Sequence, residues 1–329
     1  MKYTDYIYEQ IEIDEPVILE LINCPAMQRL KGVDQHGYLH NPKNIEFHFE
    51  KSRFNHSIGV YILLNKFGAP LEEQIAGLLH DVSHSAFSHC IDLLKGSGEK
   101  QDYQDSIHDQ YIKNTEIPKI LEKYGIDLEY ILDDSHFPLK EKDSPDLCAD
   151  RIDYILRDAV IFEEITPVKA KYFWNNLYIK NGCWVFKKME TAREFKDLFS
   201  MINCIYYSGI PTAAMFFSVS NYIRHSLDNK YIDETDLYAT DKEVLDKINK
   251  YLSQDPMLEK FYYQMNHNEN FENNLNILED KVVQKSRAID PVFLDGAKLV
   301  RISDVDLAWK EQLLKENQPK QYYLHFTKT

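Results

Sequence analysis

Helical periodicity is the feature that most constrains the fold of this chain. In residues Leu71–Val82, apolar side chains recur at the i, i+3, i+4 and i+7 positions of one buried helix face. Phe54–Phe67 and Glu190–Leu227 also show helical spacing, and Pro16–Leu30 does so on both sides of a central proline. Segments of this length and periodicity predict an all-α helical bundle.

Two short segments depart from the helical pattern. Leu177–Phe186 places an Asn-Gly pair between two apolar runs, which is the strongest local indication of a β-hairpin, and Val292–Ile302 has an Asp-Gly pair in a similar setting. No Gly/Ser-rich or Pro-rich linker separates domains. We therefore expect a helical core with a small hairpin over residues 1–228, and a C-terminal helical and hairpin region of unassigned function over 229–329.

Charge and cysteine usage bound the class of protein. The 329 residues include 53 acidic and 38 basic side chains, a formal net charge of −15, so the surface on average repels the phosphate backbone of nucleic acids. The five cysteines form no CxxC pair, and neither a signal segment nor a run of about 18 apolar residues is recognisable. We expect a cytoplasmic protein that does not span a membrane and is unsuited to nonspecific binding of duplex nucleic acid.

One predicted helix carries polar residues along a face that lies beside its apolar stripe. Ser144-Pro145 offers an N-cap and a first-turn proline for this long helix. Asp150, Tyr154 and Asp158 follow in steps of four residues, which places them within about 80° of one another around the helix axis. A polar face beside a core indicates a site.

Two histidines and two carboxylates form the candidate metal ligands. His56 and the pair His80-Asp81 are separated by two predicted helices, and an antiparallel arrangement of these would bring them together. Asp150 would complete the set. Neighbouring residues within a helix point about 100° apart, so we expect the helix to end at His80-Asp81. Mixed nitrogen and oxygen ligation suits a divalent ion, such as manganese, iron, nickel, magnesium or zinc, with positions left open for water and a phosphate oxygen.

Three motifs carry a resemblance to a known family. They are RFNHSIG at Arg53–Gly59, AGLLHDVSHSAFSH at Ala76–His89 and ADRIDYILRDA at Ala149–Ala159. Together they resemble the HD-domain superfamily of metal-dependent phosphohydrolases and, within it, the deoxynucleoside triphosphate triphosphohydrolases. The resemblance covers most of the chain and implies the HD-domain helical bundle, with the metal held by the four candidate ligands.

The resemblance also implies substrate and catalytic roles by position. Residues that would surround the reacting phosphate, with the acid or base among the histidines, are His84, His89, Asp92, His108 and Asp109. Residues that would bind the sugar and the phosphates are Gln35, Arg53, Arg151, Tyr154, Asp158 and Tyr206. The plainer alternative is that these histidines and tyrosines are core or surface residues and that the carboxylates and arginines form ordinary ion pairs.

The helix that follows the first hairpin departs from the family pattern. Tyr206 is retained, but Asn203 replaces an arginine, and Ser208-Gly209 replace a His-Lys pair that grips the outer phosphates. His36, next to Gln35, replaces an apolar residue. Removal of one charge-assisted hydrogen bond from a desolvated site costs about 1.5–3 kcal/mol. Triphosphate binding would fall by several orders of magnitude unless another segment compensates.

These residues predict a metal-dependent phosphohydrolase that acts on a nucleotide or a related small phosphate ester. Two alternatives stay open: a nucleotide-sensing regulatory protein with weak turnover, and a true deoxynucleoside triphosphate triphosphohydrolase. Nuclease action on single strands is disfavoured by the acidic charge. The resemblance further implies that the chain forms homo-oligomers.

Overall fold

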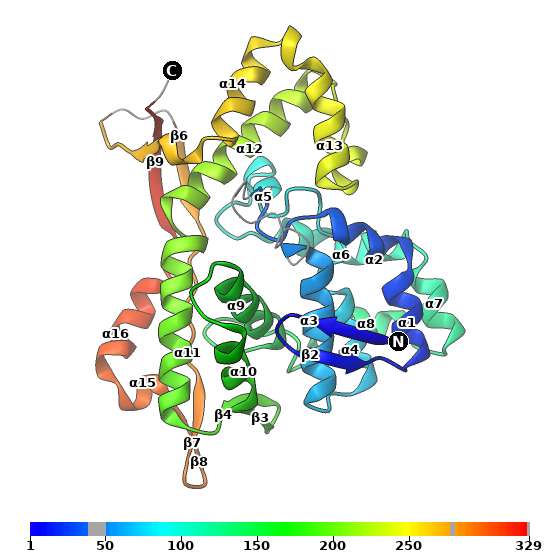
Figure 1. The fold of residues 1–329 in the computed structure, drawn as a ribbon, viewed down its shortest axis with the longest axis vertical. Helices are drawn as coiled ribbons and strands as arrows, with labels where there is room; N and C mark the ends of the chain where they lie inside the picture. The colour runs from blue at the N-terminus through cyan, green and yellow to red at the C-terminus, as the bar shows by residue number, and fades with distance from the viewer. Residues whose placement is uncertain (39–50, 277–279, 328–329) are drawn as a thin grey trace.

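The protein is predominantly helical, as the sequence predicts. The structure is a computed structural model that describes residues 1–38, 51–276 and 280–327 (Figure 1). The helices in chain order are α1 (Pro16–Asn23), α2 (Pro25–Arg29), α3 (Arg53–Lys66), α4 (Leu71–Leu79), α5 (Cys90–Leu94), α6 (Tyr103–Lys113), α7 (Ile117–Lys123), α8 (Leu128–Leu132), α9 (Ala149–Ile161), α10 (Pro167–Asn175), α11 (Met189–Ile202), α12 (Ile210–Asp228), α13 (Asp241–Ile248), α14 (Pro256–Met265), α15 (Ile302–Val305) and α16 (Leu307–Glu316).

Short strands decorate the helical body in three small sheets. They are β1 (Lys2–Asp5), β2 (Glu9–Glu12), β3 (Leu177–Lys180), β4 (Cys183–Phe186), β5 (Phe271–Asn273), β6 (Asp280–Gln284), β7 (Val292–Asp295), β8 (Lys298–Arg301) and β9 (Lys320–Phe326). The two hairpins predicted from Asn-Gly and Asp-Gly pairs are confirmed as β3–β4 and β7–β8. The last ten residues, where the sequence also allows a strand, contain β9, which pairs with β5 and β6 in the third sheet; the N-terminal hairpin β1–β2 was not predicted.

The two hairpins join into one sheet of order β3-β4-β7-β8, in which β4 and β7 run parallel. This sheet therefore links residues on both sides of position 228. A second link is the long helix α12, which packs against α5 on one side of the boundary and α14 on the other (Figure 1). The division of the chain at residue 228 stays a prediction, and the C-terminal region is in close contact with the core.

The body of the molecule is built around α3, which packs against α4 and α9. Almost the whole of α3 is buried, including the polar residues Arg53 and His56. Buried polar side chains require hydrogen-bond partners. Helix α9 supplies carboxylates to His56, and the turn after α4 supplies Asp81 to Arg53. The mainly helical fold class predicted from periodicity is confirmed, and no described helix combines the length and apolar character needed to cross a membrane.

One predicted helix start is wrong. The helix expected to begin at Ser144-Pro145 begins at Ala149, with Cys148 at the N-cap. The Ser144 hydroxyl instead donates a hydrogen bond to the backbone oxygen of Ala288, 2.7 Å away. A tertiary contact thus uses the residue that local sequence suggested as a cap.

Gly59 allows α3 and α9 to approach closely, and its replacement by alanine is expected to destabilise the protein. A Cβ atom there would lie 2.0 Å from Asp153 Oδ1 and 2.3 Å from Arg157 Nη2. Both side chains are buried and hydrogen-bonded, so they have little freedom to move. Overpacking of this kind costs about 1–3 kcal/mol, which urea unfolding of Gly59→Ala would measure. Ser57→Ala, on the same buried helix, adds no atom and is the control; equal stability of Gly59→Ala and wild type would contradict the prediction.

Candidate functional site

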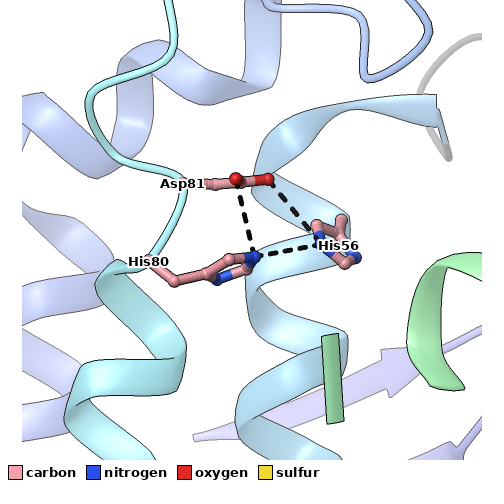
Figure 2. Close-up of side chains that lie close together, drawn as sticks. All are labelled: His56, His80 and Asp81. Carbon is pink, nitrogen blue, oxygen red and sulfur yellow. Dashed lines mark hydrogen bonds and ion pairs between the residues drawn. The ribbon is translucent and has the colours of Figure 1, made fainter. Parts of the chain in front are cut away.

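Three side chains from two neighbouring helices converge on one point. His56 lies on α3, His80 is the residue at which α4 ends, and Asp81 occupies the turn that follows (Figure 2). The Nε2 atoms of His56 and His80 are 3.1 Å apart. The Asp81 carboxylate lies 3.5 Å from His80 Nε2 and 3.7 Å from His56 Nε2. Because the helix ends at His80, Asp81 can turn its carboxylate toward the same point as the two imidazoles.

Asp150, in the first turn of α9, adds a second carboxylate. Its Oδ1 atom lies 3.0 Å from His56 Nε2 and 3.6 Å from His80 Nε2. The structure thus brings together the four residues that the sequence suggested as ligands, and we call them the metal set. Within the described part of the chain, the ligand atoms of His56, His80 and Asp81 all lie within 4.8 Å of one another, a spacing that allows one metal ion to contact all three.

Hydrogen bonds behind the imidazoles test whether a metal fits this set. His56 Nδ1 lies 2.8 Å from Asp153 Oδ2, and His80 Nδ1 lies 2.8 Å from the backbone oxygen of Gly77. A carboxylate or carbonyl only accepts hydrogen bonds, so each Nδ1 carries a proton and each ring, when neutral, directs a lone pair at Nε2 to the shared point. Two such nitrogens 3.1 Å apart beside two carboxylates need a cation between them, which is either a proton or a metal ion. The donor set therefore fits a divalent metal ion.

The carboxylates around His56 and His80 also favour a cation at this point. Burial lowers the pKa of His56, but hydrogen bonds to Asp150 and Asp153 outweigh it and raise that pKa to about 10. At His80 the Asp81 charge likewise raises the pKa against the effect of burial. The site is a pocket of negative potential that a proton or a metal ion would neutralise.

A buried ion network fixes the orientation of His56. Arg157 Nη2 lies 3.0 Å from Asp153 Oδ1 and 3.0 Å from Asp5 Oδ2, and all three side chains are almost fully inaccessible to solvent. Asp153 therefore bridges Arg157 and His56. Sequence analysis did not single out Asp153; its position three residues after Asp150, about one helical turn along α9, was the available indication of this role. Asp5 had no local indication at all.

Arg53 positions Asp81. Its Nη1 atom lies 2.6 Å from Asp81 Oδ2, its Nε donates to Ser88 Oγ, and its Nη2 donates to the backbone oxygen of Gln35. The guanidinium that the resemblance implied as a phosphate ligand is thus engaged with protein groups. His84 Nε2 lies 3.3 Å from the other Asp81 oxygen.

The remaining candidate acids and bases differ in burial and in whether they reach the cavity over the metal set. His89 Nδ1 lies 3.0 Å from Asp92 Oδ2, and burial lowers the pKa of His89 despite that carboxylate. His108 Nδ1 lies 3.2 Å from Ser83 Oγ, and burial lowers its pKa to about 4. Asp109 is exposed on α6. Of the five, His84 and His89 line the cavity described next, whereas Asp92, His108 and Asp109 do not.

A cavity of about 700 Å³ opens over the metal set. Its lining includes every residue suggested for substrate binding, namely Gln35, Arg53, Arg151, Tyr154, Asp158 and Tyr206. It also includes residues that the sequence did not place in the site, namely Tyr207, Gln101, Asp105, Lys285 and Arg287. The last two come from the C-terminal region.

The wall formed by α9 and the segment after α11 contains a second polar cluster. Asp158 Oδ1 lies 2.9 Å from His36 Nε2, and the Tyr207 hydroxyl donates to Asp158 Oδ2 at 2.5 Å. The neighbouring Tyr206 instead donates its hydroxyl to Glu164 Oε1 and stacks on Phe162. Both oxygens of Asp158 therefore already have protein partners.

Comparisons with known proteins bear on this geometry. The family model for the HD domain matches residues 53–158, the segment that contains the whole metal set. The uncharacterized protein YdhJ of Bacillus subtilis is 39% identical over 248 residues, which cover 74% of this chain and 74% of YdhJ. The metal-dependent phosphohydrolase cns2 of Cordyceps militaris is 40% identical over 170 residues, which cover 51% of this chain and 47% of cns2.

A more distant similarity involves a nucleotide enzyme. The deoxynucleoside triphosphate triphosphohydrolase SAMHD1 of Gallus gallus is 28% identical over 149 residues, which cover 39% of this chain and 24% of SAMHD1. The matched segments thus span about half the length of cns2 and about a quarter of that of SAMHD1.

Proposed function

The chain belongs to the HD-domain family, and from this we propose that it is a metal-dependent phosphohydrolase acting on a small phosphorylated molecule, with a nucleotide as the substrate class. The metal set carries the proposal. Two imidazole nitrogens and two carboxylates in the lining of one cavity face a common point, an arrangement that supports metal binding. The phosphohydrolase named cns2, 40% identical over the matched 170 residues, supports the reaction class.

The roles of the residues follow from their hydrogen bonds. His56, His80, Asp81 and Asp150 would hold the metal, which supplies a Lewis acid for a phosphoryl oxygen and lowers the pKa of a bound water. Arg53 holds the Asp81 carboxylate in place at 2.6 Å. His89, oriented through Nδ1 by Asp92, keeps Nε2 available to exchange a proton with a group in the cavity.

The shape and chemistry of the cavity support a nucleotide. Its volume of about 700 Å³ lies within the range of small-molecule sites. Tyr154 and Tyr207 present aromatic rings 5.7 Å apart, with Gln35 also in the lining, so flat apolar faces and an amide are available to a base or sugar. The relative SAMHD1, which is named for its action on deoxynucleoside triphosphates, supports the same class.

A substrate screen tests the proposal. Metal-stripped protein is incubated with manganese, iron, nickel, magnesium or zinc and with deoxynucleoside mono-, di- and triphosphates, and the products are separated by chromatography. We expect metal-dependent hydrolysis of at least one nucleotide and its loss in Asp81→Ala. Asp150→Ala removes a partly exposed carboxylate at the same site and is a second test with a smaller effect on folding.

The products also separate the competing functions. Released inorganic triphosphate would identify a triphosphohydrolase, and orthophosphate from monophosphates alone would identify a narrower enzyme. Nucleotide binding in calorimetry without product under any of the metals would overturn the proposal and favour a regulatory protein.

A further inference from the structure

Two basic side chains reach the cavity from a segment far along the chain. Lys285 and Arg287 follow β6 and line the cavity together with Arg151 of α9. We call these three residues the basic cluster. They lie on two elements separated by more than 130 positions in sequence, so only the fold brings them into one cavity.

The segment that carries Lys285 and Arg287 is held rigidly on both sides. The Ser286 hydroxyl donates to the backbone oxygen of Glu316, and the Ala288 backbone donates to Asn317 Oδ1 at 2.8 Å. The Asn203 side chain donates to Ser286 Oγ at 3.0 Å and accepts from the Arg287 backbone at 3.1 Å. This preorganisation lowers the entropy cost of presenting the two cations to a ligand.

The cations of the basic cluster lack carboxylate partners. Among the residues that the structure describes, Lys285 and Arg287 form no ion pair, and the Arg287 guanidinium donates only to the neutral Gln101 side chain at 3.2 Å. Arg151 is 7% exposed, donates to backbone oxygens of the preceding loop, and has no partner for its Nε atom among those residues. Carboxylates such as Asp105 also line the cavity, but none of them forms an ion pair with these three cations in the described part of the chain, so the cations remain available to an anion.

The electrostatic state of Lys285 agrees with this geometry. Burial and the neighbouring Arg287 charge lower the pKa of Lys285 to about 8, although Asp105 and Asp92 act in the opposite direction. A bound anion would stabilise the charged lysine and relieve its repulsion by Arg287.

We propose that Lys285 and Arg287, with Arg151, bind the part of the substrate's phosphate chain that is not cleaved at the metal set, so that the preferred substrate carries two or more linked phosphates. This inference rests on the proposed function, which places the cleaved phosphate at the metal set. An additional guanidinium and ammonium suit a phosphate chain because each forms charge-assisted hydrogen bonds with its oxygens.

Asn203 connects this proposal to the departure seen in the sequence. The resemblance expects an arginine at this position, and here a neutral amide stands in its place. That amide holds the backbone of Ser286 and Arg287, so the residue that replaces one cation anchors the segment that supplies two others. The segment after β6 thereby supplies the compensation that triphosphate binding would need.

Calorimetry of the full chain with inorganic triphosphate, pyrophosphate and orthophosphate tests the proposal. Metal-stripped protein is used, so that binding to the basic cluster is measured apart from the metal set. We expect wild type to bind triphosphate more tightly than orthophosphate, and Lys285→Ala and Arg287→Ala each to weaken triphosphate binding roughly 10-fold or more. Lys285→Arg, which keeps the charge, should retain most of the affinity. Lys281→Ala removes an exposed positive charge from the same segment and should leave the affinity unchanged.

The outcomes separate this inference from the proposed function. Equal affinities for the three anions, or triphosphate binding that is insensitive to Lys285→Ala and Arg287→Ala in proteins with wild-type unfolding curves, would overturn the inference. Triphosphate binding that depends on both residues, in a protein that hydrolyses no nucleotide, would support the inference while the proposed function fails. If hydrolysis occurs, both variants should raise the KM of a nucleoside triphosphate more than they lower kcat.

Discussion

Replacing His80 with alanine is expected to lower the affinity of the protein for Mn²⁺ by at least about 100-fold. Mutation of a residue that only hydrogen-bonds a metal ligand typically lowers metal affinity by about 10–100-fold, and loss of a ligand itself should have a larger effect. His80 supplies a lone pair that no neighbouring residue can replace, since His56 and the two carboxylates are already directed to the same point. Calorimetric titration of metal-stripped wild type and His80→Ala with Mn²⁺ measures the difference.

The same variant should fold normally, which makes its metal affinity interpretable. On the side away from the metal set, His80 Nδ1 donates one hydrogen bond to the backbone oxygen of Gly77, and the loss of this bond costs about 1 kcal/mol. His136→Ala, at an exposed histidine outside the cavity, should bind Mn²⁺ as wild type does and serves as the control. Unchanged Mn²⁺ affinity in His80→Ala would remove His80 from the metal set.

Replacing Arg157 with methionine is expected to destabilise the protein by about 3–5 kcal/mol, the cost of breaking a buried ion pair by removing one partner. Arg157 lies between Asp5 and Asp153, each 3.0 Å from its Nη2 atom. Without the guanidinium, two buried carboxylates would face each other with no intervening cation. Urea unfolding monitored by circular dichroism measures the loss.

The pH dependence of this loss gives an independent check. Burial raises the pKa of Asp153, but the Arg157 charge outweighs it and holds that pKa below its ordinary value. In Arg157→Met the folded-state pKa should rise above the unfolded one, which adds stability at low pH that disappears as the pH rises through the folded-state value. The variant should therefore lose less stability at pH 5 than at pH 8. Arg224→Met, at an exposed arginine, should be nearly neutral at both; an equal loss in the two variants would show that the buried network contributes little.

The sequence determined those features that depend on neighbouring residues. Apolar side chains at helical spacing predicted α3 and α4, and the position of His80-Asp81 predicted where α4 ends. Asn-Gly and Asp-Gly pairs located two hairpins, because these turns need residues that tolerate positive φ, as Asn181 and Gly182 do. The ligand residues were visible because three motifs occurred together at the ends of predicted helices.

Other features followed from tertiary contacts that no local pattern encodes. Tyr207, not Tyr206, bonds Asp158. Both tyrosines lie in a π-helical turn over Asn203–Tyr207 between α11 and α12, where side chains depart from the α-helical spacing that sequence reasoning assumes. Ser144 contacts Ala288 and so does not cap α9.

The helical fold class and the candidate metal ligands could thus be predicted from the amino-acid sequence, because periodicity, turn propensity and motifs are legible in neighbouring residues. The surroundings of those ligands depend on long-range packing. Asp5 supports His56 through Arg157 and Asp153, and Lys285 and Arg287 enter the cavity from beyond residue 280. These contacts depend on how distant segments pack, and the free energy that selects one packing arises from the whole buried core.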